Sequence, residues 1–216
     1  MDLARARDVM VESQVRTADV TDPRILRAMR TLARERFAPA HKRALAYADL
    51  EVEVAPGRTL MRPRDLAKLV QALAPQPGER ALEIAGATGY GAAVLAACCD
   101  QVITLDPDAD LSFAANAALE SCGVSNAKAV STPAAEGWTD EAPYDVMLLN
   151  GAAEVVPDAW LEQLAPGGRL GVIVRQGPAG AARIYTRTGD AVAYRTVFDA
   201  APPIAPGLHQ PPSFAF

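Results

Sequence analysis

The side chains best placed for chemistry lie within or at the end of two neighbouring predicted strands. Glu83 lies in a short apolar run, 81–85, and Asp106 ends the next run, 101–106, 23 residues later. A turn of small residues, 85–89, follows the first run. In an open parallel sheet, ligands bind outside the carboxyl ends of the strands, where an acid can accept hydrogen bonds from a ribose diol. The spacing indicates a nucleoside site, although such a turn can also serve only to let a helix pack closely.

Several other kinds of site are disfavoured. The turn does not match GxGxxG, which argues against a nicotinamide cofactor. The chain has two histidines and three cysteines, at 98, 99 and 122, without CxxC spacing. We therefore expect no metal site, disulfide framework or His-dependent triad, and we interpret the cysteines as core thiols in a reducing cytoplasm.

The charge balance and hydropathy also exclude classes of partner. There are 21 basic and 26 acidic residues, giving a formal net charge of −5. A protein that binds nucleic acid by neutralising phosphates is usually basic, so we expect no nucleic-acid partner. No apolar run has the length and flanks of a signal peptide or a membrane span. We expect a cytoplasmic protein with no membrane partner, while its oligomeric state is not predicted.

The elements that must position these residues alternate from residue 78 onward. Strands are expected at 81–85, 101–106, 126–130, 144–149 and 169–174, with helices at 90–99 and 108–122 and another opening at Pro157. This alternation predicts a parallel sheet covered on both faces. Two further strands around Thr188-Gly189-Asp190 predict an antiparallel C-terminal hairpin.

The segments outside this core suggest three parts of the chain. Helices are expected over 1–40 and from Pro63, with an irregular stretch around Pro56-Gly57 between them. We predict an N-terminal helical extension at 1–76, a Rossmann-like core at 77–199, and a proline-rich tail at 200–216 that packs on the core.

Over nearly the whole chain, the sequence resembles the protein-L-isoaspartate O-methyltransferases. The N-terminal similarities are specific to that family, and the central ones are shared by many methyltransferases. The resemblance implies a Rossmann-like class I fold, S-adenosylmethionine as cofactor, and repair of isomerised aspartyl residues by methylation of a protein or peptide carboxylate. The similar segments are 10–16, 22–30, 34–39, 46–63, 82–96, 142–157 and 161–174.

The resemblance also implies a cofactor site that departs from the family pattern. Where the family reads E-I-G-T-G-S-G, this chain has alanine at positions 85 and 87 and glycine at 86. An alanine forced to a positive φ costs roughly 1–2 kcal/mol, so weakened cofactor binding is expected. Thr132 stands where the family has the adenine-binding aspartate of G-D-G. The implied cofactor-binding residues are Glu83, Ala85, Gly86, Gly89, Asp106 and Thr132.

The implied catalytic stretch departs from the family as well. The family reads G-Q-T-I-S-Q-P where this chain has residues 57–63, and Met61 replaces the serine. A thioether cannot donate a hydrogen bond to a substrate. Thr59, Arg58 and Arg62 are candidates to contact the acceptor carboxylate, the alternative being that both arginines are exposed loop charges.

Three functional hypotheses follow. The first is a carboxyl O-methyltransferase of the isoaspartyl repair type, because a carboxylate is already a nucleophile and methyl transfer to it depends mainly on positioning. The second is a degenerate, non-catalytic relative that acts as a binding or regulatory protein. The third is an enzyme that keeps the cofactor but methylates a different carboxylate.

Overall fold

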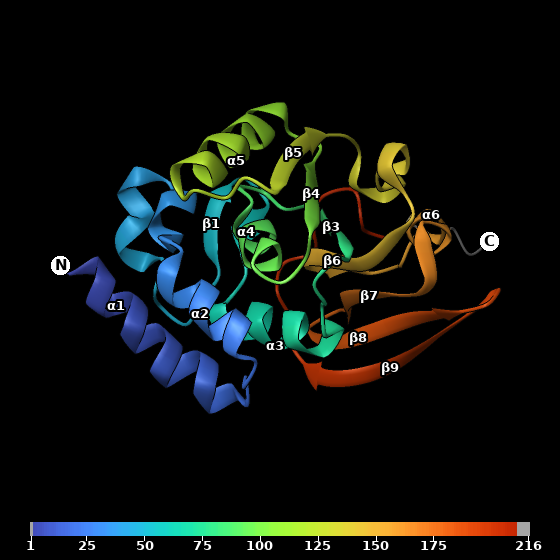
Figure 1. The fold of residues 1–216 in the computed structure, drawn as a ribbon, viewed down its shortest axis with the longest axis horizontal. Coiled ribbons are helices and arrows are strands. Elements are labelled where there is room, and N and C mark those ends of the chain that lie inside the picture. Colours follow the sequence, from blue (N-terminus) through green and yellow to red (C-terminus); the bar gives the residue numbers. More distant parts are fainter. Residues whose placement is uncertain (1, 211–216) are drawn as a thin grey trace.

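A seven-stranded mixed sheet forms the centre of the computed structural model, which describes residues 2–210 (Figure 1). Its strand order is β5-β4-β3-β6-β7-β8-β9. The first five strands in this order run parallel, and β8 and β9 form an antiparallel pair at one edge. The predicted fold class is therefore confirmed. The strands are β3 (Arg80–Ile84), β4 (Gln101–Asp106), β5 (Ala127–Ser131), β6 (Tyr144–Ala153), β7 (Leu164–Gln176), β8 (Ala179–Thr188) and β9 (Ala191–Asp199).

Side chains of successive strand residues enter two cores, one on each face of the sheet. In β3, Leu82 belongs to the core that contains Trp160 of α6 (Asp158–Glu162), whereas Ala81 belongs to the core on the other face. That second core receives α3 (Pro63–Leu73), α4 (Tyr90–Ala96) and α5 (Ala109–Ser121). This alternation is the period-2 pattern expected of strands covered on both faces.

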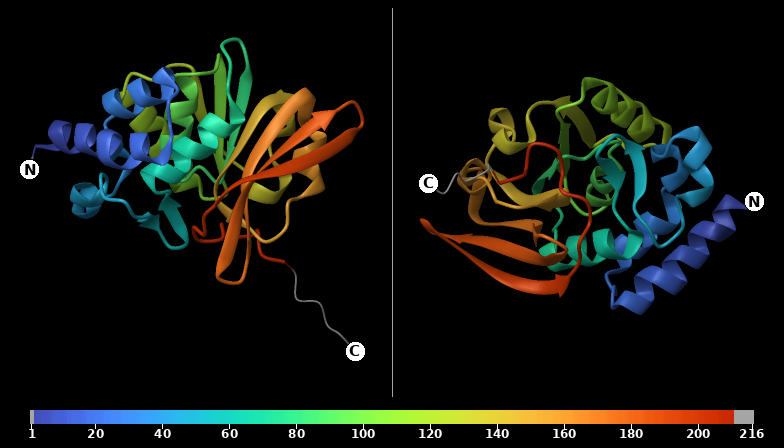
Figure 2. Two further views of the ribbon diagram at one scale, coloured as in Figure 1. Left: turned by 90° about the horizontal axis from the view of Figure 1, so that it is seen from below. Right: turned by 180° about the vertical axis from the view of Figure 1, so that it is seen from behind.

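The N-terminal residues form the predicted helical extension. It contains α1 (Leu3–Met10), which continues through a π-helical turn, and α2 (Pro23–Thr31), whose N-cap Asp22 accepts a hydrogen bond from the Arg24 amide. Figure 2 shows these helices beside α3 and α4, at the end of the molecule away from the β8–β9 hairpin. No helix among residues 2–210 is long and apolar enough to cross a membrane.

One predicted irregular stretch is in fact a β-hairpin. β1 (Val52–Ala55) pairs antiparallel with β2 (Arg58–Leu60) through the Pro56-Gly57 turn, where Gly57 has a φ of 69°. Proline followed by a positive-φ glycine suits a type II turn. The strands have four and three residues, too few for hydrophobic alternation to reveal them. The hairpin places Arg58 and Thr59 on a strand with fixed register.

The segment after β9 returns to the centre of the sheet. β3 pairs with β6 only as far as Leu149, and Ile204 then forms a parallel bridge with Ala152 further along β6. The Ala152 amide donates to the Pro203 carbonyl at 3.0 Å, and Ala152 accepts from the Ala205 amide at 2.9 Å. Residues 203–205 thus take the place beside β6 that β3 leaves. The part of the expected tail at 211–216 lies outside the described residues.

Candidate functional site

The turn after β3 has a strained backbone. Ala85 and Ala87 have φ values of 54° and 52°, and both are buried. A non-glycine residue in the left-handed region costs roughly 1–2 kcal/mol. Both alanines therefore adopt the positive φ that makes an alanine unfavourable in this turn. Gly86 is not among the positive-φ residues, so it does not relieve this strain.

Gly86 is needed because its surroundings leave no space for a Cβ atom. A Cβ at this position would lie 1.9 Å from Thr104 Oγ1 and 2.5 Å from Glu83 Oε2. A Cβ at Gly91, in α4, would lie 1.9 Å from Glu83 Oε1. The two glycines therefore enclose the Glu83 carboxyl group, and the threonine that the family has at the position of Gly86 does not fit this arrangement.

Glu83 is fully buried beneath the turn. Its Oε2 accepts hydrogen bonds from Thr104 Oγ1 at 2.7 Å and from the Ala92 amide at 3.0 Å, and its Oε1 has no partner among the described residues. Burial raises the pKa of Glu83 to about 8, against the opposing effect of these two donors. The contacts join β3, β4 and α4 beneath the turn, and the cofactor role of Glu83 stays a prediction.

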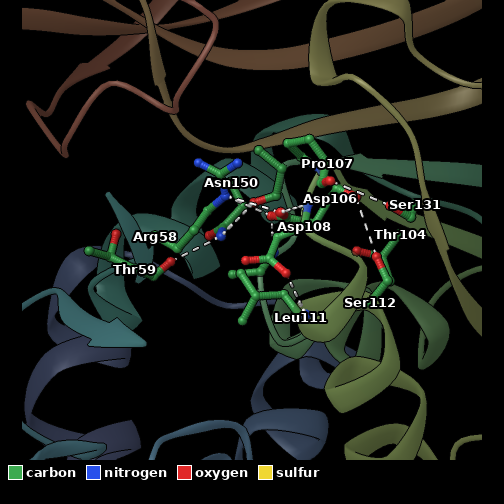
Figure 3. A network of polar contacts seen from close by, with 12 residues as sticks. Arg58, Thr59, Thr104, Asp106, Pro107, Asp108, Leu111, Ser112, Ser131 and Asn150 are labelled. Atoms are coloured by element: carbon green, nitrogen blue, oxygen red, sulfur yellow. Dashed lines mark hydrogen bonds and ion pairs between the residues drawn. The ribbon is translucent and has the colours of Figure 1, made fainter. Parts of the chain in front are cut away.

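Asp106 ends β4 and lies between Arg58 and Asp108, as Figure 3 shows. Only 2% of its surface is exposed. Its Oδ2 accepts from the Ala87 amide at 3.2 Å, and its Oδ1 accepts from the Asp108 amide at 3.0 Å. Beside it, the Thr132 amide donates to the Asp106 carbonyl at 3.3 Å. The structure brings the turn, Asp106 and Thr132 together at the carboxyl ends of β3, β4 and β5.

Arg58 forms an ion pair with Asp106. Its Nε lies 2.9 Å from Oδ2 and 3.1 Å from Oδ1. The Arg58 side chain is 8% exposed, and its Nη1 is buried without a partner among the described residues. Arg58 is therefore not an exposed loop charge. Arg62, in contrast, is 37% exposed and pairs with Glu51 at 3.0 Å.

Asn150 is a site residue that sequence reasoning did not single out. It lies in β6, and its Nδ2 donates to the Thr59 carbonyl at 3.0 Å and to the Ala85 carbonyl at 3.1 Å. This side chain joins the β1–β2 hairpin to the strained turn. The available signal was its place at the end of the predicted central strand 144–149, where polar side chains commonly face a ligand.

Arg34 is a second residue that the sequence did not reveal. It is fully buried, donates from Nε to the Ala46 carbonyl at 2.7 Å and from Nη2 to the Met61 carbonyl at 2.5 Å, and stacks over the Tyr90 ring at 4.5 Å. Burial lowers the pKa of Arg34. The Met61 side chain is 1% exposed and belongs to the apolar core. Arg34 therefore fixes the backbone of the hairpin segment while Met61 turns inward.

No group of three or more His, Cys, Asp or Glu side chains within residues 2–210 is arranged to hold a metal ion. The cysteines there are free thiols. The chemistry of the site is thus that of the turn, the Arg58–Asp106 pair, Asn150 and the β1–β2 hairpin.

The strand order, with the turn after β3 and Asp106 at the carboxyl ends of the parallel strands, defines a class I methyltransferase fold. A family model described as "Protein-L-isoaspartate(D-aspartate) O-methyltransferase" matches residues 5–199. The chain belongs to this family.

Named relatives and solved structures agree with that assignment. The chain is 40% identical over 179 residues to the protein-L-isoaspartate O-methyltransferase of Methylorubrum populi, covering 83% of this chain and 82% of the relative. It is 38% identical over 168 residues to that of Koribacter versatilis, covering 78% and 75%. A solved protein-L-isoaspartate O-methyltransferase superposes with a TM-score of 0.82 at 23% identity, covering 94% of this chain and 67% of the other.

A Plasmodium falciparum structure shares the fold at a lower identity. It is described as a putative protein-L-isoaspartate O-methyltransferase in complex with S-adenosyl-L-homocysteine. Its TM-score is 0.78 at 17% identity, and the match covers 92% of this chain and 97% of that one. At these identities the two structures support the fold, and the curated relatives support the family.

Proposed function

We propose that this protein is an S-adenosylmethionine-dependent carboxyl O-methyltransferase that acts on isoaspartyl residues of proteins or peptides. The family match across residues 5–199 is the observation that carries the proposal. The curated relatives bear the same name at 38–40% identity over most of the chain. The comparisons give no support to the non-catalytic alternative. The proposal includes a cytoplasmic location, where free thiols such as those of this chain persist.

The side chains at the carboxyl ends of β3, β4 and β5 carry polar groups of the types that would hold such a cofactor. Asp106 offers a carboxylate for the ribose hydroxyls, and the Ala87 amide holds that carboxylate at 3.2 Å. Thr132 lies beside it, at the position implied for the adenine. These are the acceptor groups that a nucleoside requires at this edge of a parallel sheet.

The chemistry requires positioning more than proton transfer. When bound, the cofactor supplies a methyl group on a sulfonium, which makes that carbon electrophilic. The acceptor carboxylate is already a nucleophile, so no side chain of this protein has to remove a proton. Asn150 and Arg34 hold the β1–β2 hairpin in place. Thr59 and Arg62 are the groups of this segment that we assign to the acceptor, because the Met61 side chain is buried in the core.

Methyl transfer to matched peptides tests the proposal. The full chain is incubated with S-adenosylmethionine carrying a labelled methyl group and with either an isoaspartyl peptide or the same peptide containing a normal aspartyl residue. We expect a base-labile methyl ester on the isoaspartyl peptide alone. Absence of transfer to it at saturating cofactor would contradict the proposal, and equal transfer to the normal peptide would assign the activity to a different carboxylate.

A further inference from the structure

The Arg58–Asp106 pair lies in the place proposed for the ribose. We propose that Arg58 is an intramolecular competitor of the cofactor, so that a nucleoside binds Asp106 only after the Arg58 side chain has left it. The inference rests on the proposed function, because it takes the ligand to be an adenosyl compound. It makes Arg58 a residue that determines the affinity of the site for its cofactor.

The contacts of Asp106 occupy most of its acceptor positions. A carboxylate has about four lone-pair directions. Oδ1 accepts from Arg58 Nε at 3.1 Å and from the Asp108 amide at 3.0 Å, while Oδ2 accepts from Arg58 Nε at 2.9 Å and from the Ala87 amide at 3.2 Å. The single Arg58 Nε–H is shared between both oxygens, so three N–H donors act on about four lone pairs, and too few remain for two ribose hydroxyls while all three persist.

The three partners of Asp106 differ in how freely they can leave it. The Ala87 amide belongs to the turn after β3, and the Asp108 amide belongs to the N-cap of α5, so both are fixed by the backbone. Arg58 reaches Asp106 through a flexible side chain from the β1–β2 hairpin, as Figure 3 shows. The Arg58 side chain is the one of the three partners that can leave without moving the turn or the helix.

The burial of the Arg58–Asp106 pair opposes its replacement by a ligand. The Arg58 and Asp106 side chains are 8% and 2% exposed, so water screens their attraction little. A ligand must replace a cation with neutral hydroxyl groups, which makes the exchange unfavourable. The observed association constant equals the intrinsic one multiplied by the fraction of molecules in which Arg58 has left Asp106.

Two features of its geometry nevertheless weaken the Arg58–Asp106 pair. Only Nε of Arg58 donates to Asp106, and the terminal nitrogens point away from the carboxylate in Figure 3. The bidentate arrangement that gives arginine–carboxylate pairs their greatest strength is absent from this contact. Arg58 Nη1 also has no acceptor among residues 2–210, so the guanidinium is incompletely satisfied where it lies.

The chain offers a matched control in Arg62. This residue follows Arg58 by four positions, and its Nε pairs with Glu51 at 3.0 Å instead of with Asp106. Arg58→Gln and Arg62→Gln remove the same charge from the same segment, and glutamine is what the family motif has at both positions. A general effect of charge on the cofactor would appear in both variants, whereas competition for Asp106 would appear only in Arg58→Gln.

Calorimetric titration of the full chain with S-adenosylhomocysteine tests the competition. We expect Arg58→Gln to bind at least tenfold more tightly than the unsubstituted chain and Arg62→Gln to stay within threefold of it. Equal or weaker binding by Arg58→Gln, or no binding by any of the three proteins, would overturn the inference. Methyl transfer by the unsubstituted chain without tighter binding by Arg58→Gln would reject the competition alone, and tighter binding without transfer would reject the proposed activity alone.

A measurement on the unsubstituted chain covers the case in which Arg58→Gln does not fold. The side-chain Nε–H signal of Arg58 is followed by nuclear magnetic resonance in the 15N-labelled protein, assigned with Arg58→Lys. Saturation with S-adenosylhomocysteine is expected to shift this signal and speed its exchange with water, and to leave the Arg62 signal unchanged. An Arg58 signal that stays in place at saturation would overturn the proposal.

Discussion

Glu83 and Asp106 are both buried carboxyl groups on adjacent strands, and their surroundings give them different tasks. Asp106 faces a cation and two backbone amides at the carboxyl ends of the strands. Glu83 lies inside the packing between β3, β4 and α4, bonded to one hydroxyl and one amide. Burial without a cation favours the protonated acid, which is why the pKa of Glu83 rises to about 8. The comparison teaches that two acids beside the same turn can differ in charge because their partners differ.

The most disruptive test of this comparison is Gly86→Ala. The new methyl group would overlap Thr104 Oγ1 and the Glu83 carboxyl group, which are themselves buried. We expect the free energy of unfolding in urea to fall by at least about 3 kcal/mol, the upper range of overpacking effects. Gly78→Ala is the control, because Gly78 has a φ of 88° but no atom within 4 Å of the new methyl group. A loss of about 1 kcal/mol is expected there, and an equal loss in the two variants would contradict the role of space at Gly86.

The next test uses the pH dependence of stability. Glu83 has a folded-state pKa of about 8 and an ordinary value of 4.5, so the folded chain holds the proton more tightly. Its contribution is complete below pH 4.5 and is lost as the pH rises through 8. Between pH 6 and pH 9 we expect the free energy of unfolding to fall by roughly 2–3 kcal/mol on this account.

Glu83→Gln should remove this slope. The control is Glu120→Gln on the exposed side of α5, which should retain it. Denaturant unfolding at several pH values measures both. If Glu83→Gln kept the slope of the unsubstituted chain, the buried acid would not be its source.

A third test separates the two acids by ligand binding. Asp106→Asn removes the carboxylate that we assign to the ribose, and we expect the affinity for S-adenosylhomocysteine to fall at least tenfold, about 1.4 kcal/mol. Glu83→Gln should change the affinity by less than threefold at pH 7, because the acid that it replaces supports the turn from behind. Calorimetry compares the two variants. Equal losses of affinity in both would remove the distinction between a supporting acid and a binding acid.

The smallest expected effect concerns the strained alanines. Ala74 ends α3 with a φ of 48° and an exposed methyl group. Ala74→Gly should raise the free energy of unfolding by about 1 kcal/mol. Ala85→Gly relieves the same strain but loses a buried methyl group, worth about 0.8 kcal/mol, so its net change should lie near zero. Thermal and urea unfolding measure both, and a larger gain at Ala85 than at Ala74 would contradict this reasoning.

Local sequence patterns predicted the sheet and the place of the candidate site on it. The apolar runs and the turns between them indicated the parallel strands, and the rule that ligands bind at carboxyl ends located Asp106 and the turn. β6 and β7 extend beyond the predicted 144–149 and 169–174. Their ends are stabilised by pairing with neighbouring segments, which a hydrophobic pattern does not show.

The contacts that decide the behaviour of the site were not predictable in the same way. Arg58 and Asp106 are 48 residues apart, and Asn150 and Thr59 are 91 apart. The resemblance suggested that Arg58 holds a substrate carboxylate, and the structure instead pairs it with a carboxylate of the same chain. Arg34 likewise depends on carbonyl groups brought close by folding. Pairings of this kind depend on tertiary geometry, which residue spacing alone does not contain.

The place of residues 203–205 beside β6 has a consequence for the integrity of the molecule. These residues satisfy the amide and carbonyl of Ala152, and Leu208 accepts from the Glu154 amide at 3.0 Å. Proteolytic removal of the segment would leave this stretch of a central strand as an open edge, lined by apolar side chains. An open edge of that kind is a template for pairing with other chains. Residues 203–208 thus cover an edge of β6 that would otherwise be open.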